Sequence, residues 1–253
     1  MSNRALVRPP SARLEQGLVT HQQRQPVDVA RAREQWQDYC HALDAAGWDT
    51  VEVAAADQLP DAVFVEDTVV MFGETAVLTK PGANERVAEV HGTEKALRQL
   101  GYRPVDLPGG RLDGGDVLKV GRRCYVGVGG RTDPAGVAAL RTVVAPLGYL
   151  VTAVPTRKVL HLKSAVTALP DESVIGHPPL VDDPGFFPLF RAVPEEAGAH
   201  VVDLGGGRVL MSAAAPRSAE LIAGLGFEVI STDIGEFEKL EGCVTCLSVR
   251  LRD

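Results

Sequence analysis

A short apolar motif next to charged residues recurs along the chain at a nearly constant interval. Each recurrence leads into short strand-like runs, and helical stretches follow several of them. Five positions mark the recurrences, with successive separations of 48, 48, 42 and 38 residues: Phe64, Leu112, Leu160, Val202 and Leu240. Self-similarity of this length is typical of stacked supersecondary units. The sequence therefore predicts an α/β fold of five units closed into a ring, with a strand over residues 4–7 completing the last unit. An ordinary α/β domain with evenly spaced strands is the alternative.

The segments around these positions follow from hydrophobic period and from helix-start signals. Residues 27–46 carry an apolar stripe at helical spacing, and Gly47 follows where a helix would stop. Asp133 and Pro134 have the order of an N-cap and a first helical residue. Residues 11–26 show little periodicity and are predicted to form a loop. Since no segment resembles a domain linker, we predict a single catalytic domain over residues 1–253.

Composition and charge narrow the class of protein. The chain is 45% hydrophobic and 23% charged, as in ordinary globular proteins, and its formal net charge is −7. This charge argues against nucleic acid or an anionic membrane as a partner and favours, weakly, a cationic ligand. The sequence shows no membrane-spanning run and no signal-peptide core, and four cysteines are too few for a disulfide scaffold. We expect a reduced, cytoplasmic protein; whether it forms a homodimer stays open.

The last apolar run, residues 241–251, singles out one cysteine. Leu247, Val249 and Leu251 alternate with other residues, which predicts a strand with one buried face. Cys246 and Ser248 then lie on the opposite face. A cysteine that avoids the apolar face is a candidate nucleophile, although a plain buried thiol is the commoner fate of this residue type.

Cys243 and Cys246 also form a C-x-x-C pair, which raises two other interpretations. A structural zinc site would need a second pair of ligands, and none is present. A redox pair is expected at the head of a helix rather than inside a strand pattern. The same pattern places Cys243 on the face opposite Cys246, so Cys243 is predicted to be a packed thiol.

Charged and basic side chains gather at the same recurring positions. His161 stands between Leu160 and Leu162 and alternates out of an apolar stripe, which predicts that residues 160–163 form a strand with His161 on its non-core face. A hydrogen-bonded core histidine is the other interpretation. Several acids occupy the equivalent places in other units: Asp61, Glu66, Asp67, Asp113, Asp116 and Glu241. For Asp116 a solvated turn or cap is favoured, and Gly114 and Gly115 are interpreted as turn glycines. If the units form a ring, the remaining carboxylates converge with one imidazole and one thiol, a set that suits a planar guanidinium cation.

These motifs resemble the dimethylarginine dimethylaminohydrolase family of the guanidino-group modifying pentein superfamily. The resemblance extends from about residue 5 to residue 251 and rests on blocks that occur in the family's order: residues 64–67, 80–83 with Arg86, 112–118, 125–127 with Arg131 and Thr132, 160–164, and 245–248. It implies the pentein five-bladed α/β propeller, built from ββαβ-type units around a pseudo-fivefold axis. It also implies a small-molecule guanidino substrate, no cofactor and no metal.

The resemblance further implies roles for individual residues. Cys246 would attack the guanidinium carbon of an Nω-methylated arginine, and His161 would serve as general acid and then general base. Asp67 and Asp113 would hold the guanidinium nitrogens and orient His161. Asp61, Glu66 and a carbonyl of Leu18 or Val19 would lie at the α-amino end of the substrate. Arg86 and Arg131 would bind its α-carboxylate. Glu241 is a further substrate-binding candidate, where relatives carry Asp. Citrulline and methylamine or dimethylamine would be the products.

Two other classes of function stay open. Arginine and agmatine deiminases share the fold and the thiol chemistry, although arginine deiminases are usually longer. Some penteins are non-catalytic binding proteins, but these lack the cysteine, histidine and carboxylate set.

Overall fold

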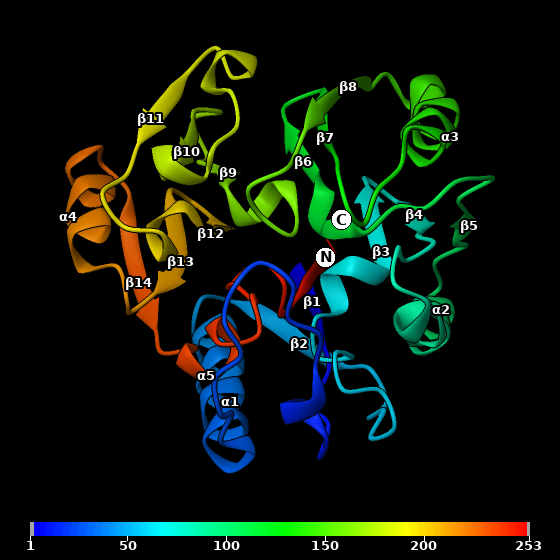
Figure 1. Cartoon of the computed structure of the whole chain (residues 1–253), viewed down its shortest axis with the longest axis horizontal. Coiled ribbons are helices and arrows are strands. Elements are labelled where there is room, and N and C mark those ends of the chain that lie inside the picture. The colour runs from blue at the N-terminus through cyan, green and yellow to red at the C-terminus, as the bar shows by residue number, and fades with distance from the viewer. Residues whose placement is uncertain (1–2, 252–253) are drawn as a thin grey trace.

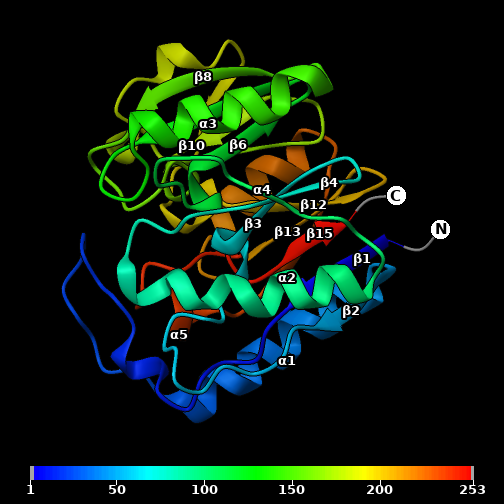
Figure 2. The same ribbon diagram turned by 90° about the vertical axis from the view of Figure 1, so that its right-hand side faces the viewer.

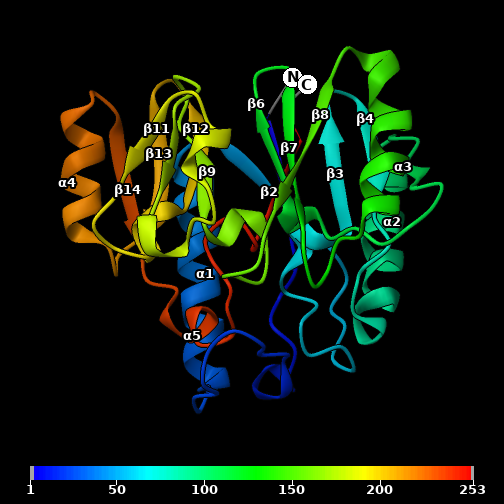
Figure 3. The same ribbon diagram turned by 45° about the horizontal axis from the view of Figure 1, so that its top comes forward.

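Five three-stranded sheets surround a central axis in the computed structural model, which describes residues 3–251 (Figure 1). In each sheet the central strand pairs antiparallel with one neighbour and parallel with the other. A parallel pair needs a crossover segment, and the α-helices that supply it lie on the outer side of the ring (Figure 3). The ring of five α/β units is therefore as the spacing predicts.

Four of the units contain an α-helix in the crossover between their two parallel strands, and the fifth unit, described below, is one of them. The first unit consists of β3 (Val69–Phe72), β4 (Thr75–Leu78), α2 (Val90–Gln99) and β5 (Val105–Asp106). The second consists of β6 (Val117–Val120), β7 (Arg123–Val128), α3 (Pro134–Val144) and β8 (Leu150–Pro155), and the fourth of β12 (Val201–Gly205), β13 (Arg208–Ser212), α4 (Pro216–Gly224) and β14 (Glu228–Thr232). Asp133 caps α3 by accepting a hydrogen bond from the Gly136 amide, and Pro134 is its first residue, as predicted.

The third unit departs from this pattern. Its strands β9 (Val166–Ala168), β10 (Val174–Gly176) and β11 (Phe190–Ala192) are joined by a crossover without an α-helix among the described residues. The 3₁₀ turns Pro178–Leu180 and Pro184–Phe186 take its place. The proline-rich crossover sequence explains the difference, because proline removes a backbone donor and breaks a helix interior.

The fifth unit joins the two ends of the described chain. Strand β1 (Asn3–Val7) pairs antiparallel with β15 (Val249–Leu251) and parallel with β2 (Trp48–Glu52), as Figure 2 shows. Helix α1 (Val29–Ala45) covers this sheet, and Asp28 accepts hydrogen bonds from two amides at its start. The N-terminal strand thus completes the last unit, as predicted. This closure supports the proposal of a single domain over residues 1–253, of which residues 1, 2, 252 and 253 lie outside the described part.

The apolar core is divided into clusters that lie between neighbouring units. Val70 and Val77 of the first unit, for example, pack in one buried cluster with Val117, Val126 and Val137 of the second. Leu6 and Val249 of the fifth unit pack in the same way against the first. Each unit therefore depends on its neighbours for the burial of its apolar face. No helix in residues 3–251 is long and apolar enough to cross a membrane.

Two strand predictions near the axis are wrong. In residues 241–251 only β15 is a strand. Cys246 lies in a turn, where its amide donates to the Cys243 carbonyl at 3.0 Å. Residues 160–163 also form no strand, because His161 precedes the 3₁₀ turn Leu162–Ser164. Apolar residues two positions apart can be buried by tight turns as well as by strands, so the period alone could not separate the two.

Candidate active site

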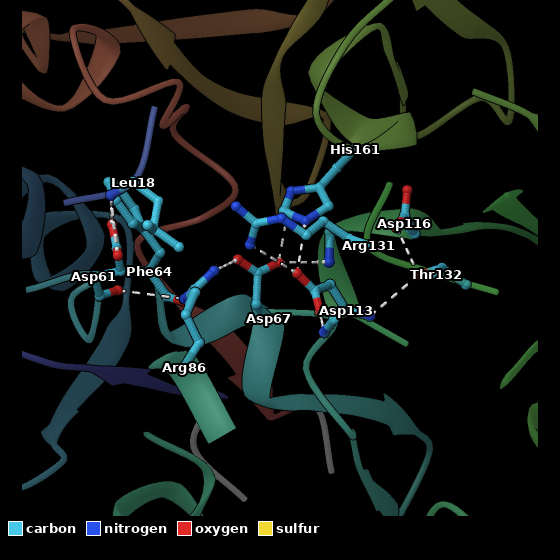
Figure 4. A network of polar contacts seen from close by, with 12 residues as sticks. Leu18, Asp61, Phe64, Asp67, Arg86, Asp113, Asp116, Arg131, Thr132 and His161 are labelled. Atoms are coloured by element: carbon cyan, nitrogen blue, oxygen red, sulfur yellow. Dashed lines mark hydrogen bonds and ion pairs between the residues drawn. The ribbon is translucent and has the colours of Figure 1, made fainter. Parts of the chain in front are cut away.

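Turns from different units carry the predicted catalytic groups to the ring axis. The first three recurring positions each precede a 3₁₀ turn: Val65–Thr68, Gly114–Asp116 and Leu162–Ser164. Asp67 lies in the first turn, Asp113 just before the second and His161 just before the third. Figure 4 shows these three side chains pointing toward one another, together with Arg131. The equivalent ends of three repeats therefore meet, as the ring predicts.

A small cavity next to these turns is lined by most of the predicted site residues. Eight of the ten lie in its wall: Cys246, His161, Asp67, Asp61, Arg86, Arg131, Leu18 and Glu241. The cavity measures about 20 Å³, which is room for roughly one water molecule. A guanidino compound can therefore enter only when the wall moves, and the loop that holds Leu18 is the segment placed to do so. Asp113 and Glu66 are the two predicted residues outside this wall.

Asp113 lies behind the imidazole. The Nε2–H of His161 donates to Asp113 Oδ2 at 2.9 Å, and Nδ1 lies 3.9 Å from Asp67 Oδ1. Burial by itself would lower the pKa of His161, but Asp67, Asp113 and Asp116 raise it to about 9. His161 is therefore an imidazolium at neutral pH and can act as an acid.

Asp67 is held in its ionised form. Its carboxylate accepts hydrogen bonds from Arg86 Nη1 at 2.5 Å and from the Gly115 amide at 2.8 Å. Burial would raise the pKa of Asp67, but His161 and Arg86 hold it well below its usual range. A fixed negative charge thus faces the cavity beside the imidazole.

Gly115 is required for this close packing. A Cβ atom there would lie 2.7 Å from Asp67 Oδ1 and 2.8 Å from His161 Nδ1. At Gly114 it would lie 2.1 Å from the Glu66 carbonyl oxygen. Both glycines lie in the 3₁₀ turn Gly114–Asp116, as predicted, but neither has a positive φ angle, so close approach between repeats explains why both positions are glycine.

Asp116, interpreted from sequence as a solvated turn or cap residue, is instead fully buried. It accepts hydrogen bonds from the Leu162 amide at 2.9 Å and from Thr132 Oγ1 at 2.6 Å. Burial raises its pKa to about 6. Asp116 therefore holds the turn that carries His161. Its only sequence signal was its place close to Asp113, after the second recurring position.

The two arginines in the cavity wall differ in whether the guanidinium group has a donor left for a ligand. Arg86 is buried, and its donors reach Glu89, Asp67 and two main-chain carbonyls. Arg131 lies with Nη1 3.6 Å from Asp113 Oδ2, and this buried nitrogen makes no hydrogen bond in the described structure. An unsatisfied buried donor facing a cavity is a ready binding group for an anion.

Glu66 faces a different space from the other acids. It accepts a hydrogen bond from Lys163 Nζ at 2.5 Å, and both residues line a second cavity of about 470 Å³ along the ring. Neither lines the small cavity. Burial raises the pKa of Glu66. The structure thus separates Glu66 from the substrate position that the family resemblance implied for it.

The loop of residues 11–26 covers the small cavity, and the carboxylates of Asp61 and Glu241 hold it there. It lies at the end of the ring opposite to that where β15 finishes (Figure 2). The Leu18 amide donates to both oxygens of Asp61 at 3.1 Å. The backbone of Glu241 has a positive φ of 61°. The carboxylate of Glu241 accepts hydrogen bonds from the amides of Thr20, His21 and Gln22 and from the Thr20 hydroxyl. Glu241 therefore touches the loop as well as the cavity.

Replacement of Glu241 by Ala should loosen this loop. Residues 20–22 would lose their common acceptor, and KM should rise several-fold with a smaller change in kcat, because the closed loop is needed to hold substrate. Hydrogen exchange of the Thr20–Gln22 amides should become faster, while the exposed control Glu34→Gln leaves both measurements as in the wild type. Unchanged exchange in Glu241→Ala would show that other contacts hold the loop.

The nucleophile candidate has a second thiol beside it. Cys246 lines the cavity, and its Sγ lies 3.2 Å from the Sγ of Cys243, so the prediction of opposite faces for the two cysteines is wrong. The turn over residues 244–247 explains the error, since it folds the two side chains together. The hydrogen bond between the thiols lowers the pKa of Cys243 and raises that of Cys246, which burial and the charges of Glu66 and Asp67 raise further.

Asp67, Asp113 and His161 are also the one group in residues 3–251 whose ligand atoms could share a metal ion, lying within 4.8 Å of one another. Arg86 and Arg131 compete for the same carboxylates. A cation would have to displace these guanidinium groups, so the donor set fits a metal poorly.

A test of the imidazole's charge follows from these contacts. The folded-state pKa of His161 is raised from 6.5 to about 9, so its ion pairs stabilise the fold fully below pH 6.5, and this stabilisation is lost as pH rises through 9. Asp113→Asn removes one charge and should lower the pKa of His161 by about one unit.

Imidazole NMR titration measures this shift directly. The control Asp133→Asn keeps a good N-cap and should leave His161 unchanged. An unaltered His161 titration in Asp113→Asn would contradict the role of Asp113.

Comparison with known proteins places the chain. No protein-family model matches it. It is 60% identical over its full length to the N(G),N(G)-dimethylarginine dimethylaminohydrolase of Streptomyces coelicolor, covering 98% of that protein. It is 31% identical to the enzyme of the same name from Pseudomonas aeruginosa, over 99% of this chain and all of that one.

A solved structure of the Pseudomonas aeruginosa protein, a cysteine-to-serine mutant complexed with citrulline, superposes with a TM-score of 0.91 over 99% of each chain. The N-terminal domain of a cyanobacterial arginine dihydrolase, at 22% identity, shares the fold with a TM-score of 0.84. The ring of five units is thus the α/β propeller of the pentein superfamily. Within it, the chain belongs to the dimethylarginine dimethylaminohydrolase family.

Proposed function

We propose that this protein hydrolyses Nω-methylated arginines to citrulline and methylamine or dimethylamine. The observation that carries the proposal is the single buried cavity in which Cys246, the charged imidazole of His161 and the carboxylate of Asp67 meet, in a chain of this family. A thiol, an acid-base group and a fixed anion are the set that addition to a guanidinium carbon needs.

In the first step Cys246 Sγ bonds to the guanidinium carbon. In the empty site the hydrogen bond to Cys243 and burial raise the Cys246 pKa, and the carboxylates of Glu66 and Asp67 raise it further. A bound guanidinium cation would offset these carboxylates and lower the Cys246 pKa, so substrate helps to form its own nucleophile. As the carbon–nitrogen bond to the methylated nitrogen breaks, His161 donates its proton to the departing amine. The product on the enzyme is a covalent thiouronium at Cys246.

In the second step a water molecule adds to the same carbon. His161, now neutral, takes a proton from that water, and the bond from carbon to Sγ breaks to release citrulline and the free thiol. Asp113 and Asp67 stabilise the imidazolium in both steps through the contacts described above. No cofactor takes part in this scheme.

The amino-acid end of the substrate is assigned from one unused donor, on Arg131, and from acceptors that lie at the cavity. We place the α-carboxylate at Arg131, because its Nη1 lacks a hydrogen bond in the described structure. Arg86 adds positive charge and fixes Asp67. Asp61 and the Leu18 carbonyl are placed at the α-amino group, and Glu241 closes the loop over it. Glu66 is given no contact with the substrate, because it lines the larger cavity along the ring.

Replacement of Arg131 by Leu tests this orientation. KM for a methylated arginine should rise roughly ten- to a hundredfold, the usual cost of a lost charged hydrogen bond, with a smaller change in kcat. The KM for agmatine analogues, which lack the carboxylate, should be nearly the same in Arg131→Leu and in the wild type. A KM that stays at the wild-type value would place the carboxylate elsewhere.

One assay separates the candidate functions. Asymmetric dimethylarginine, monomethylarginine, arginine and agmatine are offered to the purified protein, and citrulline or its decarboxylated analogue is measured. Turnover of the methylated arginines supports the proposal, while turnover of arginine alone or of agmatine alone would indicate a deiminase. Binding without turnover would indicate a non-catalytic role.

The cellular setting is proposed from the free cysteines and the net charge. All four cysteines are free, and we propose a reduced, cytoplasmic location on that ground. A homodimer is a hypothesis that light scattering after size-exclusion chromatography would test. The negative charge supports the proposal that nucleic acid and anionic membranes are not partners.

A further inference from the structure

We propose that Cys243 and Cys246 form a reversible disulfide when a hydroperoxide enters the site, which switches the thiol chemistry off. The inference rests on the proposed function in one respect only: the disulfide inactivates because Cys246 is the nucleophile. Formation of the bond itself needs only the geometry of the two thiols.

The geometry places the sulfurs nearly in bonding range. Their separation of 3.2 Å exceeds a disulfide bond of about 2.0 Å by roughly the length that small side-chain rotations supply. Both cysteines belong to one turn, in which the Cys246 amide donates to the Cys243 carbonyl. The Cys243 amide also points at Cys246 Sγ at 3.5 Å. The main chain thus already holds the pair together.

The two thiols differ in access, which divides the chemistry between them. Cys246 lines the cavity, so a small oxidant reaches it when the loop over the cavity opens. Cys243 is buried beside it, and the hydroxyl of Thr245 lies 3.3 Å from its sulfur. The low pKa of Cys243 favours its thiolate, the form that attacks an oxidised sulfur.

The reaction balances in two steps. Cys246 first gives its proton to the Cys243 thiolate across the hydrogen bond between the two sulfurs. The resulting Cys246 thiolate attacks a peroxide oxygen, the oxygen–oxygen bond breaks, and sulfenic acid and hydroxide or alkoxide result. Cys243 then attacks the sulfenic sulfur, and the hydroxyl group leaves as water after it takes up a proton. The hydroperoxide is reduced by two electrons, and the two cysteines together are oxidised by two. Without Cys243 the sulfenic acid can proceed to the sulfinic acid, which a thiol reductant does not reverse.

The remaining cysteines provide internal controls. Cys40 is buried in α1, and burial raises its pKa to about 12. Cys124 is fully buried in β7, and its pKa is raised to about 11. Neither cysteine lines the small cavity, so an oxidant that enters there does not reach them. Oxidation is therefore expected to be confined to the C-x-x-C turn.

Peptide mass spectrometry tests the inference without any turnover. The reduced protein is treated with hydrogen peroxide, free thiols are alkylated, and trypsin releases residues 240–250, which contain both cysteines. We expect this peptide to be unalkylated and two hydrogen atoms lighter, and to return to the doubly alkylated form after dithiothreitol. A peptide with sulfinic acid at Cys246 and an alkylated Cys243 would overturn the proposal, as would one with both thiols unchanged after prolonged exposure.

Activity measurements add the functional half. Loss of methylarginine hydrolysis should follow the crosslinked fraction and be restored by dithiothreitol in the wild type and in the control Cys40→Ala. In Cys243→Ala the loss, taken relative to that variant's own starting rate, should become irreversible. If the reduced protein does not hydrolyse methylarginines, the proposed function fails while the mass measurement still decides the disulfide.

Discussion

Cys246→Ser is expected to lower kcat for methylarginine hydrolysis by roughly a thousandfold or more, since no other group in the cavity can form the covalent intermediate. A serine hydroxyl is a far weaker acid than a thiol and would stay protonated even next to a bound guanidinium. The substitution also changes one atom of a nearly isosteric side chain, so the turn over residues 244–247 should keep its main-chain hydrogen bond.

Binding and chemistry can be separated in this variant. Substrate should still bind, because Asp67, Arg131 and Asp61 are unchanged, and isothermal titration calorimetry should report an affinity close to that of the wild type. Cys243→Ser serves as the matched control, as it alters the neighbouring thiol and leaves the nucleophile in place. Appreciable turnover in Cys246→Ser would contradict the covalent mechanism.

His161→Ala is expected to slow the reaction by roughly a hundred- to ten-thousandfold, the range that loss of a general acid-base group produces. Both steps should suffer, since the amine leaves without a proton and the water attacks without a base. The pH profile adds a second signature. In the wild type, the activity that depends on the acid form should fall as pH rises through about 9, and this limb should be absent from the variant.

A substrate with a good leaving group distinguishes the two roles of His161. An isothiourea analogue of arginine expels a thiolate, which needs no proton from the enzyme. In His161→Ala the first step should then proceed while the second stays slow, so the thiouronium accumulates on Cys246 and appears in the intact mass. His41→Ala, on α1, is the matched control. Fast turnover without an adduct would show that another group supplies the base.

Sequence reasoning was most successful for the motif that recurs in every unit. The spacing of the five positions identified the ring, and the ring predicted that Asp67, Asp113 and His161 would meet. It failed where a single turn decides the outcome. Alternating apolar residues near Cys246 and His161 were interpreted as strands, and so Cys243 was placed away from Cys246.

Burial and competition between charges were also outside the reach of the sequence. Nothing in the pattern showed that Lys163 would engage Glu66 on the far side of the site, or that Glu89 would occupy Arg86 and leave Arg131 with the unused donor. Asp116 was undervalued for the same reason, because its partners lie 16 and 46 residues away along the chain.

The pairing of β1 with β15 has a consequence for the order of assembly during synthesis. Strand β1 is made first, yet one of its two neighbours, β15, follows it by most of the chain. Contacts so distant in sequence form late and slowly. The turn with Cys246 directly precedes β15, so the reactive thiol reaches its place only when the fifth sheet closes. A growing chain that still lacks residues 243–251 would therefore hold its histidine and carboxylates without the nucleophile, and chemistry would begin only after the fifth sheet has closed.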